Sequence, residues 1–308
     1  MTWWKEVRGF PSAPMLASPT TATKSRAAVD PYSLEGRYSF DVKLDGVRAI
    51  MVIEQKRCAI INRNGVDITA RYPELPVGLG NTSPIVLDGE IVSMDGSFET
   101  LAFRDRQSNP RKITEMTVTH PVQFIAFDVL SGLGYDLRSE KWKERRRLLD
   151  GLTLPESISR TVVSESAGLL DLVSDLGMEG VIAKRHESTY TSGRSREWLK
   201  FKALHRVSCV PTGYEPGNGQ RAHFGAMHLA MIGPDGPVDV GRVGTGFDDD
   251  TITYLKKRLD NGDLFVVEIE TLNRTKTGVL RFPVFKGVRS DLEPKDCTVD
   301  QLETLPTC

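Results

Sequence analysis

The sequence has few cysteines, and their spacing excludes two common kinds of site. The four cysteines are far apart and form no C-x-x-C pair; they are Cys58, Cys209, Cys297 and Cys308. This spacing argues against a zinc ribbon and provides no disulfide framework. A reducing cytosolic setting is therefore the expectation.

Long apolar runs are also missing. No stretch approaches the about 20 apolar residues that a membrane-spanning helix needs. The opening segment MTWWKEVRGFPSAPMLA is too polar and too rich in proline for a secretory leader. We therefore expect no signal peptide and no membrane partner. The sequence also lacks internal repeats and low-complexity segments.

Charge of one sign is not in excess. The net charge is −1 over 308 residues, of which 39% are hydrophobic and 26% are charged. These values are typical of a globular protein with one large or two ordinary domains. Any polyanionic partner must therefore be bound by a local basic patch.

The first two thirds of the chain predict a mixed domain. Residues 36–130 alternate short apolar runs with turn signals, which indicates mostly antiparallel strands. Helices are expected over 98–107, 141–152 and 169–177. The run Arg145-Arg146-Arg147 in the second of these helices is interpreted as a solvated face.

Residues 205–308 have a different composition, with many glycines between short segments that are typical of strands. Short strands separated by glycine turns in about 100 residues favour a small β-barrel of the OB kind. Its one helix is expected at 248–260, capped by Asp248 to Asp250. The predicted class is therefore α+β: an antiparallel-sheet domain over residues 1–203, followed by an OB-fold barrel over 204–308.

The segment FDVKLDGVRAIMV, residues 40–52, places Lys43 and Arg48 around Asp45-Gly46 in what reads as a buried hairpin. Two solvated flanks of a turn are the simple interpretation. However, similar charges recur beside glycines or inside other apolar strands. The collected set is Lys43, Asp45, Arg48, Arg63, Asp88, Glu90, Asp128, Glu179, Lys184, Lys200 and Lys202. Such a set on the strand ends of one sheet indicates a cleft for a polyanion and a metal ion.

A second basic stretch is SGRSREWLKFKALHR, residues 192–206, whose five cations accompany Glu197 alone. Lys200 and Lys202 are two apart, so both are expected on one face of a strand. The stretch predicts a local phosphate-binding patch.

Nucleotidyl transfer through a lysine requires such a set. A lysine attacks only as the free amine, which desolvation and neighbouring cations favour. Glu179 and Glu90 could bind a metal ion directly, through water, or bind ribose hydroxyls instead. Mg²⁺ keeps much of its water shell, so no His or Cys cluster is needed. His223 and His228 are interpreted as surface or packing residues.

These stretches resemble the covalent nucleotidyltransferases, and most closely the ATP-dependent DNA ligases of bacterial end joining. PMLAS, KLDGVR, NRNG, LDGEI, FIAFDVL, EGVIAK and WLKFK occur in the family's order. GYEPGNGQRAHFGAMHLAMIG, GRVGTGF and LRFPVFKGVRSDLEP are similar to the OB domain of those ligases. The resemblance covers nearly the whole chain and implies a nucleotidyltransferase domain of ATP-grasp-like fold.

The resemblance also implies residue roles. Lys43 would form the adenylate with AMP, and Arg48 and Glu90 would contact ribose or the nick end. Arg63 would reach a phosphate, Phe127 would stack on adenine, and Glu179, with Glu90, would support the metal. Lys200 and Lys202 would touch the α-phosphate, and Arg289 and Asp291 would close over the ATP phosphates.

Two positions depart from the family pattern. Asp41 replaces the usual Glu that meets the adenine amino group and is one methylene shorter. Leu292 stands where Lys or Arg usually follows the last aspartate, and Lys295 is a candidate substitute. Slow self-adenylation with preserved sealing of preadenylated DNA would follow if Lys295 cannot substitute.

The activity implied is an ATP-dependent DNA ligase that seals 5′-phosphate/3′-hydroxyl nicks through lysyl-AMP and 5′-adenylated DNA, with Mg²⁺ or Mn²⁺. The expected partner is nicked duplex DNA, with a repair or replication protein as a further candidate, and the expected state is a monomer in the cytoplasm of a bacterial or phage-infected cell. An RNA ligase, an mRNA-capping guanylyltransferase and a non-catalytic nucleic-acid-binding relic are alternatives. An NAD-dependent ligase is disfavoured because its zinc-finger cysteines are missing.

The sequence leaves open whether replication, repair or end joining is served, and whether DNA or RNA strands are preferred. It also leaves open how DNA is held without a further DNA-binding domain. The glycine-rich stretch 215–226 is a candidate for that task.

Overall fold

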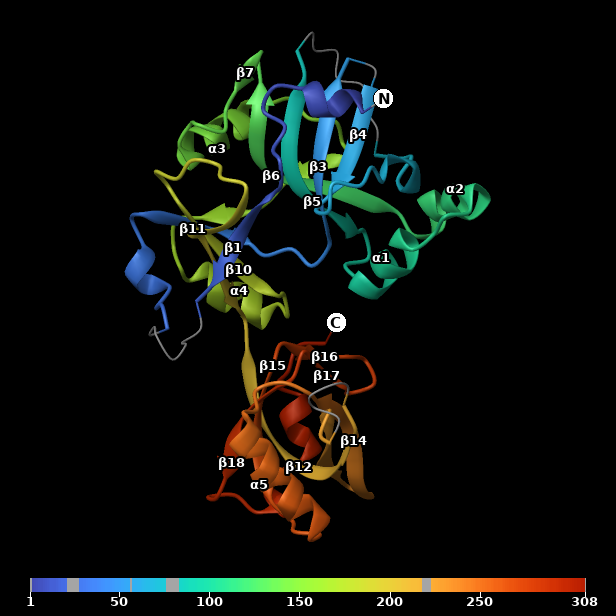
Figure 1. Ribbon diagram of the computed structural model, residues 1–308, viewed down its shortest axis with the longest axis vertical. Coiled ribbons are helices and arrows are strands. Elements are labelled where there is room, and N and C mark those ends of the chain that lie inside the picture. Colours follow the sequence, from blue (N-terminus) through green and yellow to red (C-terminus); the bar gives the residue numbers. More distant parts are fainter. Residues whose placement is uncertain (1, 21–27, 56, 76–82, 218–222, 308) are drawn as a thin grey trace. The chain divides into compact units, whose positions relative to one another are not determined.

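The computed structural model describes residues 2–20, 28–55, 57–75, 83–217 and 223–307 (Figure 1). The chain divides into two compact units. The N-terminal unit comprises Met1–Val173 and Glu179–Phe201, and the C-terminal unit comprises Ser174–Met178 and Lys202–Cys308. No helix among the described residues has the length and apolar character needed to cross a membrane.

Two sheets form the framework of the N-terminal unit. The five-stranded sheet has the order β1-β11-β10-β2-β9; its strands are β1 (Met15–Pro19), β2 (Tyr38–Val42), β9 (Val163–Ser164), β10 (Gly180–Arg185) and β11 (Gly193–Lys202). The other sheet has the order β4-β3-β5-β6-β7, with β8 beside β6; its strands are β3 (Val47–Glu54), β4 (Arg57–Asn62), β5 (Ile85–Ser93), β6 (Val122–Gly132), β7 (Tyr135–Asp136) and β8 (Ile158–Arg160). β2, β3 and β5 pair antiparallel with their neighbours, whereas β1–β11 and β6–β8 are parallel.

The helices of the N-terminal unit are α1 (Phe98–Asp105), α2 (Pro110–Thr119), α3 (Trp142–Gly151) and α4 (Leu169–Asp175), the last of which extends into the segment 174–178. Short 3-10 helices occur at Trp3–Glu6, Tyr32–Leu34 and Thr69–Arg71. Strand β3 divides the core because successive side chains point to opposite faces. Met51 belongs to a cluster with residues of α1 and α3, whereas Ile50 packs with Met15 of β1 and Trp198 of β11. The second cluster therefore lies between the two sheets.

The C-terminal unit contains a five-stranded sheet of order β14-β13-β12-β15-β18. Its elements are β12 (His205–Glu215), β13 (Ala226–Gly233), β14 (Gly236–Val243), α5 (Asp249–Asp260), β15 (Val266–Thr271), β16 (Asn273–Arg274), β17 (Leu280–Arg281) and β18 (Val284–Arg289), with 3-10 helices at Pro294–Asp296 and Val299–Leu302. The long strand β12 pairs antiparallel with both β13 and β15. The large core cluster of this unit includes Ile252 and Leu255 of α5.

The predicted helices are confirmed with shorter bounds, but α2 is missing from the prediction. Asp248 caps α5 as expected, since its carboxylate accepts a hydrogen bond from Thr251 N at 2.9 Å. Asn109 caps α2 in the same way and Pro110 follows as its first residue. Asn109 and Pro110 are therefore the sequence signal for the start of α2. The apolar pattern gave no sign of this helix, because α2 buries only Ile113 and Met116.

The expected hairpin over 40–52 is wrong. β2 ends at Val42 and β3 begins at Val47, but the two strands belong to different sheets. Residues 43–46 therefore cross from one sheet to the other. The charged residues that were expected on a single sheet are correspondingly divided between two.

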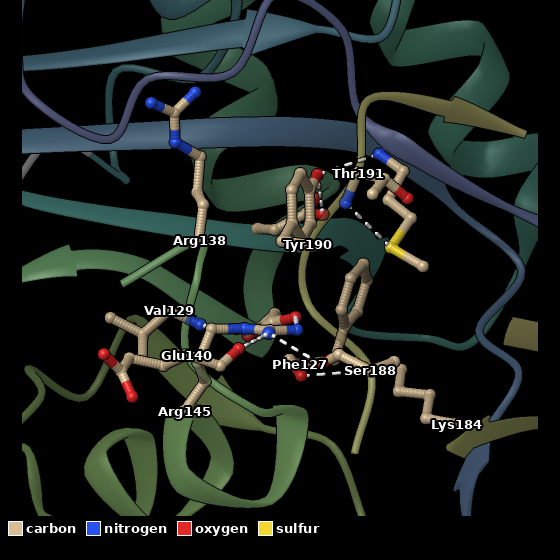
Figure 2. Close-up of polar contacts among 12 residues, drawn as sticks. Phe127, Val129, Arg138, Glu140, Arg145, Lys184, Ser188, Tyr190 and Thr191 are labelled. Carbon is tan, nitrogen blue, oxygen red and sulfur yellow. Dashed lines mark hydrogen bonds and ion pairs between the residues drawn. The ribbon is translucent and has the colours of Figure 1, made fainter. Parts of the chain in front are cut away.

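The interpretation of Arg145 as a solvated residue is also wrong. Its side chain and that of Asp128 are both fully buried, and the guanidinium binds both carboxylate oxygens at 2.7 and 2.8 Å. Arg145 also donates to the carbonyl oxygens of Glu140 and Ser188, at 2.6 and 3.2 Å (Figure 2). Arg147, in contrast, is 74% exposed. Arg146 is intermediate, 15% exposed, and donates to Thr161 O at 3.2 Å. Only Arg147 of the run therefore fits the predicted solvated face.

Candidate active site

A cavity of about 500 Å³ opens in the N-terminal unit, with walls from both sheets. Seven of the predicted site residues line it: Asp41, Lys43, Arg48, Arg63, Glu90, Phe127 and Lys200. Residues of β2 and β11 form one side of the cavity, and residues of β3, β5 and β6 form the other. The division of the charges between two sheets therefore brings them to face one another.

Lys43 is held at the end of β2 by its pairing with β10. Val42 lies opposite Val181, and Lys43 N donates to Gly180 O at 2.8 Å. This register brings Glu179 beside Lys43, and the ammonium forms an ion pair with the Glu179 carboxylate. The side chains remain 21% and 12% exposed. Glu179 does not line the cavity, but it contacts the cationic end of a residue that does.

Gly46 is required by the neighbouring strand. A Cβ at this position would lie 2.3 Å from Ile91 O and 2.6 Å from Glu90 Cγ. The glycine therefore lets the crossing segment pass against β5. This close packing accounts for the glycine.

Arg48 is fixed from behind the cavity. Its guanidinium binds both oxygens of the buried Asp88 carboxylate at 2.7 Å and lies 4.4 Å from the centroid of the Phe127 ring. The hydroxyl of Tyr190 donates to Asp88 Oδ2 at 2.7 Å and accepts from Met15 N at 2.9 Å (Figure 2). Arg48, Asp88 and Tyr190 thus join the two sheets, and they orient one cation towards the cavity.

Glu90 lies opposite Arg48 in the β3–β5 pairing. The pKa of its carboxyl is raised to about 7, mainly by burial. Arg48 and Lys43 oppose the shift, and the charges of Asp88 and Glu179 add to it. Glu90 therefore titrates near neutral pH inside the cavity.

This titration predicts a pH effect on stability. The pKa of Glu90 is about 7 in the folded chain and near 4.5 when unfolded, so the unfolded state loses its proton first as pH rises. The Glu90 contribution to stability is consequently present below about pH 4.5 and is lost as pH rises through about 7. Glu90→Gln should therefore become more stable relative to wild type between pH 5 and pH 8, as measured by urea unfolding. A constant difference across this range would contradict the assignment.

Asp41 and Lys184 form a buried ion pair on the opposite wall. Lys184 Nζ donates to Asp41 Oδ2 at 2.7 Å and to Phe127 O at 3.1 Å, and it lies 4.4 and 4.5 Å from the ring centroids of Phe127 and Trp198. Burial raises the pKa of Asp41 and lowers that of Lys184, while their mutual attraction opposes both shifts. Asp41 Oδ1 is buried without a hydrogen-bond partner. Because Asp41 lines the cavity, this oxygen is an acceptor available to a ligand.

The described residues contain no cluster of three or more His, Cys, Asp or Glu side chains that could hold a metal ion. Glu90 and Glu179 are nevertheless near enough for the charge of one to raise the pKa of the other. Mg²⁺ is usually bound by one or two carboxylates together with water and substrate phosphates. The pair therefore fits an ion that arrives with a phosphate ligand.

The remaining predicted residues belong to the C-terminal unit. Arg289 binds both oxygens of Asp291, at 2.7 and 2.8 Å, and its third nitrogen lies 3.3 Å from Glu268 Oε1. Leu292, which departs from the family pattern, packs its side chain against a small buried cluster. Lys295 is exposed and forms an ion pair with Glu293 at 2.5 Å.

Phe282 was not singled out by the sequence. It is 56% exposed and has φ of 53°, an unusual conformation for a bulky residue. Lys202 Nζ and the Arg281 guanidinium carbon each lie 5.2 Å from its ring centroid. Residues 271–290 contain five cations and no acid, which was the available signal. Of the stretch 215–226, residues 218–222 lie outside the described residues.

The sequence also gave no role to Asp88, Lys184 or Tyr190, although the first two were in the collected set of charges. Their partners lie 40 to 143 positions away along the chain. His223 is exposed and His228 is partly buried, as expected for surface or packing residues.

Comparisons with known proteins identify the family. The model of the ATP dependent DNA ligase domain matches residues 14–202. The multifunctional non-homologous end joining protein LigD of Mycolicibacterium smegmatis is 30% identical over 325 residues, which cover 95% of this chain and 40% of that protein. The chain thus spans less than half the length of this relative.

Two solved structures resemble the chain over most of its length. The ligase domain of M. tuberculosis LigD is 27% identical with a TM-score of 0.54, covering 93% of this chain and 97% of that one. A mycobacterial DNA ligase D complexed with ATP and MES is 26% identical with a TM-score of 0.51 and the same coverage. The resemblance drawn from the motifs is confirmed, and the chain belongs to the ATP-dependent DNA ligase domain family.

Proposed function

We propose that this protein is an ATP-dependent DNA ligase that seals 5′-phosphate/3′-hydroxyl nicks in duplex DNA. Lys43 carries the proposal, because it is the one residue that combines the family's nucleophile motif with a place in a cavity of suitable size. In the first step the Lys43 amine attacks the α-phosphorus of ATP and pyrophosphate leaves. The AMP then passes to the DNA 5′-phosphate, and the 3′-hydroxyl displaces it.

Lys43 has to lose a proton before it attacks. Its side chain is paired with the Glu179 carboxylate, so this ion pair has to open before the amine can attack. Glu90, with a pKa of about 7, is a carboxylate in the same cavity that can accept a proton. The arrangement therefore supports a resting state in which the Lys43 ammonium, paired with Glu179, cannot attack.

The other cavity residues suit the parts of a nucleotide. Asp41 Oδ1 can accept a hydrogen bond from the adenine amino group, and the Phe127 ring can stack on the base. We propose that Arg48 and Glu90 contact the ribose or nick end and that Arg63 and Lys200 contact phosphates; all four line the cavity. These roles rest on chemistry and on the family motifs.

Glu90 and Glu179 are the proposed ligands for Mg²⁺ or Mn²⁺ that accompanies the ATP phosphates. When bound, such an ion would offset phosphate charge during transfer. The ion would also compete with the Lys43 ammonium for the Glu179 carboxylate.

We propose that the two domains are residues 1–203, for adenylation, and residues 204–308, an OB-fold barrel. The pairing of the long strand β12 with both β13 and β15, and of β15 with β18, supports a five-stranded barrel that is partly open. Phe282 between two cations gives this domain an aromatic face and positive charge, which suits contact with nucleic acid.

Arg289 tests the role of the C-terminal domain. We propose that Arg289 and Asp291, with Lys202, act on the ATP phosphates in the first step only. Arg289→Ala should slow adenylation from ATP at least about 10-fold, because one charge-assisted phosphate contact contributes about 1.5–3 kcal/mol. It should leave sealing of a preadenylated nick within about 2-fold, near one RT of free energy.

Arg206→Ala is the matched control, since Arg206 also pairs with Glu268 on the same sheet. It should change neither step. Equal losses in both assays for Arg289→Ala would mean that Arg289 serves DNA binding or folding instead.

The proposed partner is nicked duplex DNA, and the names of the LigD relatives point to end joining as the process. A monomer is the proposed state. The function is tested by incubating the protein with labelled ATP or GTP and a divalent cation, followed by a denaturing gel and a nick-sealing assay. ATP-dependent labelling with sealing is expected; labelling by GTP alone would indicate a capping-type enzyme.

A further inference from the structure

The turn between α1 and α2 concentrates positive charge. Residues 106–112 contain Arg106, Arg111 and Lys112 and no acid. All three side chains belong to exposed residues. No carboxylate of the described residues forms an ion pair with any of them, whereas the exposed Arg57, Arg147 and Arg185 of this unit each have such a partner.

The one acid at this turn is already engaged. Asp105 accepts hydrogen bonds from Arg71 Nη1 at 3.1 Å and from the Tyr72 hydroxyl at 2.9 Å. Arg71 also donates to the Asp105 carbonyl at 2.7 Å. Asp105 is thus engaged by Arg71 and Tyr72. The nearest other acid, Glu115, lies one turn along α2 and forms no ion pair with Arg111 or Lys112.

The turn is mounted rigidly. Arg104 of α1 is 1% exposed, and its guanidinium donates to His120 O at 2.6 Å, at the end of α2, and to Glu74 at 2.6 Å. This buried side chain ties α1, α2 and the segment after β4 together. The backbone that carries the three cations is therefore held in place. Less conformational entropy is lost when a partner binds to side chains on an ordered backbone.

The support is joined directly to the candidate active site. The α1–α2 segment connects β5 to β6, the strands that carry Glu90 and Phe127, and α2 projects beyond the sheets (Figure 1). Glu90 is three residues before the end of β5 at Ser93, which corresponds to about 10 Å along a strand. From Ser93 the chain continues to α1 at Phe98, and the α1–α2 turn follows directly after Asp105.

We propose that Arg106, Arg111 and Lys112 form a contact surface for the phosphate backbone of duplex DNA beside the nick. The inference rests on the proposed function and adds a second point at which the DNA is held. Cations on a shallow, exposed turn read no base edges, so the contact is independent of sequence.

The test is the salt dependence of DNA binding. A triple variant, Arg106→Gln with Arg111→Gln and Lys112→Gln, is compared with wild type by fluorescence anisotropy on a nicked duplex whose 3′-dideoxy end cannot be sealed. Each phosphate contact contributes about 0.9 to the slope of log affinity against log salt, so the slope should fall by about 2 to 3. Adenylation from ATP should stay unchanged, because none of the three lines the cavity.

The matched control removes three cations from α3, with Lys141→Gln, Lys143→Gln and Arg147→Gln. These side chains are 53%, 47% and 74% exposed and have acidic partners, so their loss should leave the slope as in wild type. If the triple variant unfolds, Arg111→Gln with Lys112→Gln should still lower the slope by about 1 to 2.

A wild-type slope in the α1–α2 variant, or equal losses in both triple variants, would overturn the contact surface and leave the proposed function standing. Failure of the wild-type protein to bind nicked duplex at all would overturn both.

Discussion

Replacing Lys43 by alanine should abolish adenylation and lower nick sealing by at least about 10³-fold, since no other side chain can form the covalent intermediate. The fold should survive. Lys43 contributes one partly exposed ion pair, so the free energy of unfolding should change by no more than about 1 kcal/mol. Labelled ATP on a denaturing gel, with urea unfolding beside it, measures both effects.

Preadenylated nicked DNA provides the control for this variant. On that substrate the AMP is already transferred, so Lys43→Ala should recover most of the sealing activity. Lys143→Ala, on an exposed helix, should behave as wild type throughout. A folded Lys43→Ala protein that still forms the adduct would remove Lys43 from the reaction.

Replacing Arg145 by methionine should cost about 3–5 kcal/mol of stability, because it leaves the Asp128 carboxylate buried without its partner. The Glu140 carbonyl oxygen would lose the donor that Arg145 provides, and the Ser188 carbonyl oxygen would keep only Trp142 N, at 2.7 Å. This loss is a large part of the total stability of an ordinary domain, about 5–15 kcal/mol. A shift of the urea unfolding midpoint to much lower concentration is the expected result.

Arg147→Met is the comparison, since it lies on the same helix and changes the same chemical group. Arg147 is exposed and pairs only with Glu144, so its loss should change stability by less than about 1 kcal/mol. Equal midpoints for the two variants would show that burial of Arg145 does not matter to the fold.

Local patterns predicted the elements well where a single rule decides them. The short continuous apolar run in VRAIMVIE marks β3, because both faces of the strand are buried, each in a different cluster. The aspartate run before α5 marks its start, because a cap acts within one turn. α2 was missed because its two buried side chains leave almost no apolar period.

The errors concern pairing over long range. Nothing in Asp45-Gly46 tells whether the next strand joins the same sheet, so the two-sheet site could not be predicted from the turn. The same holds for Arg145, whose partner is on β6, and for the pair of Asp41 with Lys184, which are 143 positions apart. The order of the family motifs nevertheless identified residues of the cavity, because the motifs from PMLAS to WLKFK each contribute at least one side chain to its lining.

The central claim is that Lys43 becomes covalently linked to AMP, and peptide mass mapping tests it most directly. The protein is incubated with ATP and Mg²⁺, denatured, digested and analysed for peptides that have gained one AMP. A single modified site at Lys43 is the result that the structure and the family predict. Modification of another residue, such as Lys200 or Lys184, or no modification in a preparation that seals nicks with ATP, would contradict it.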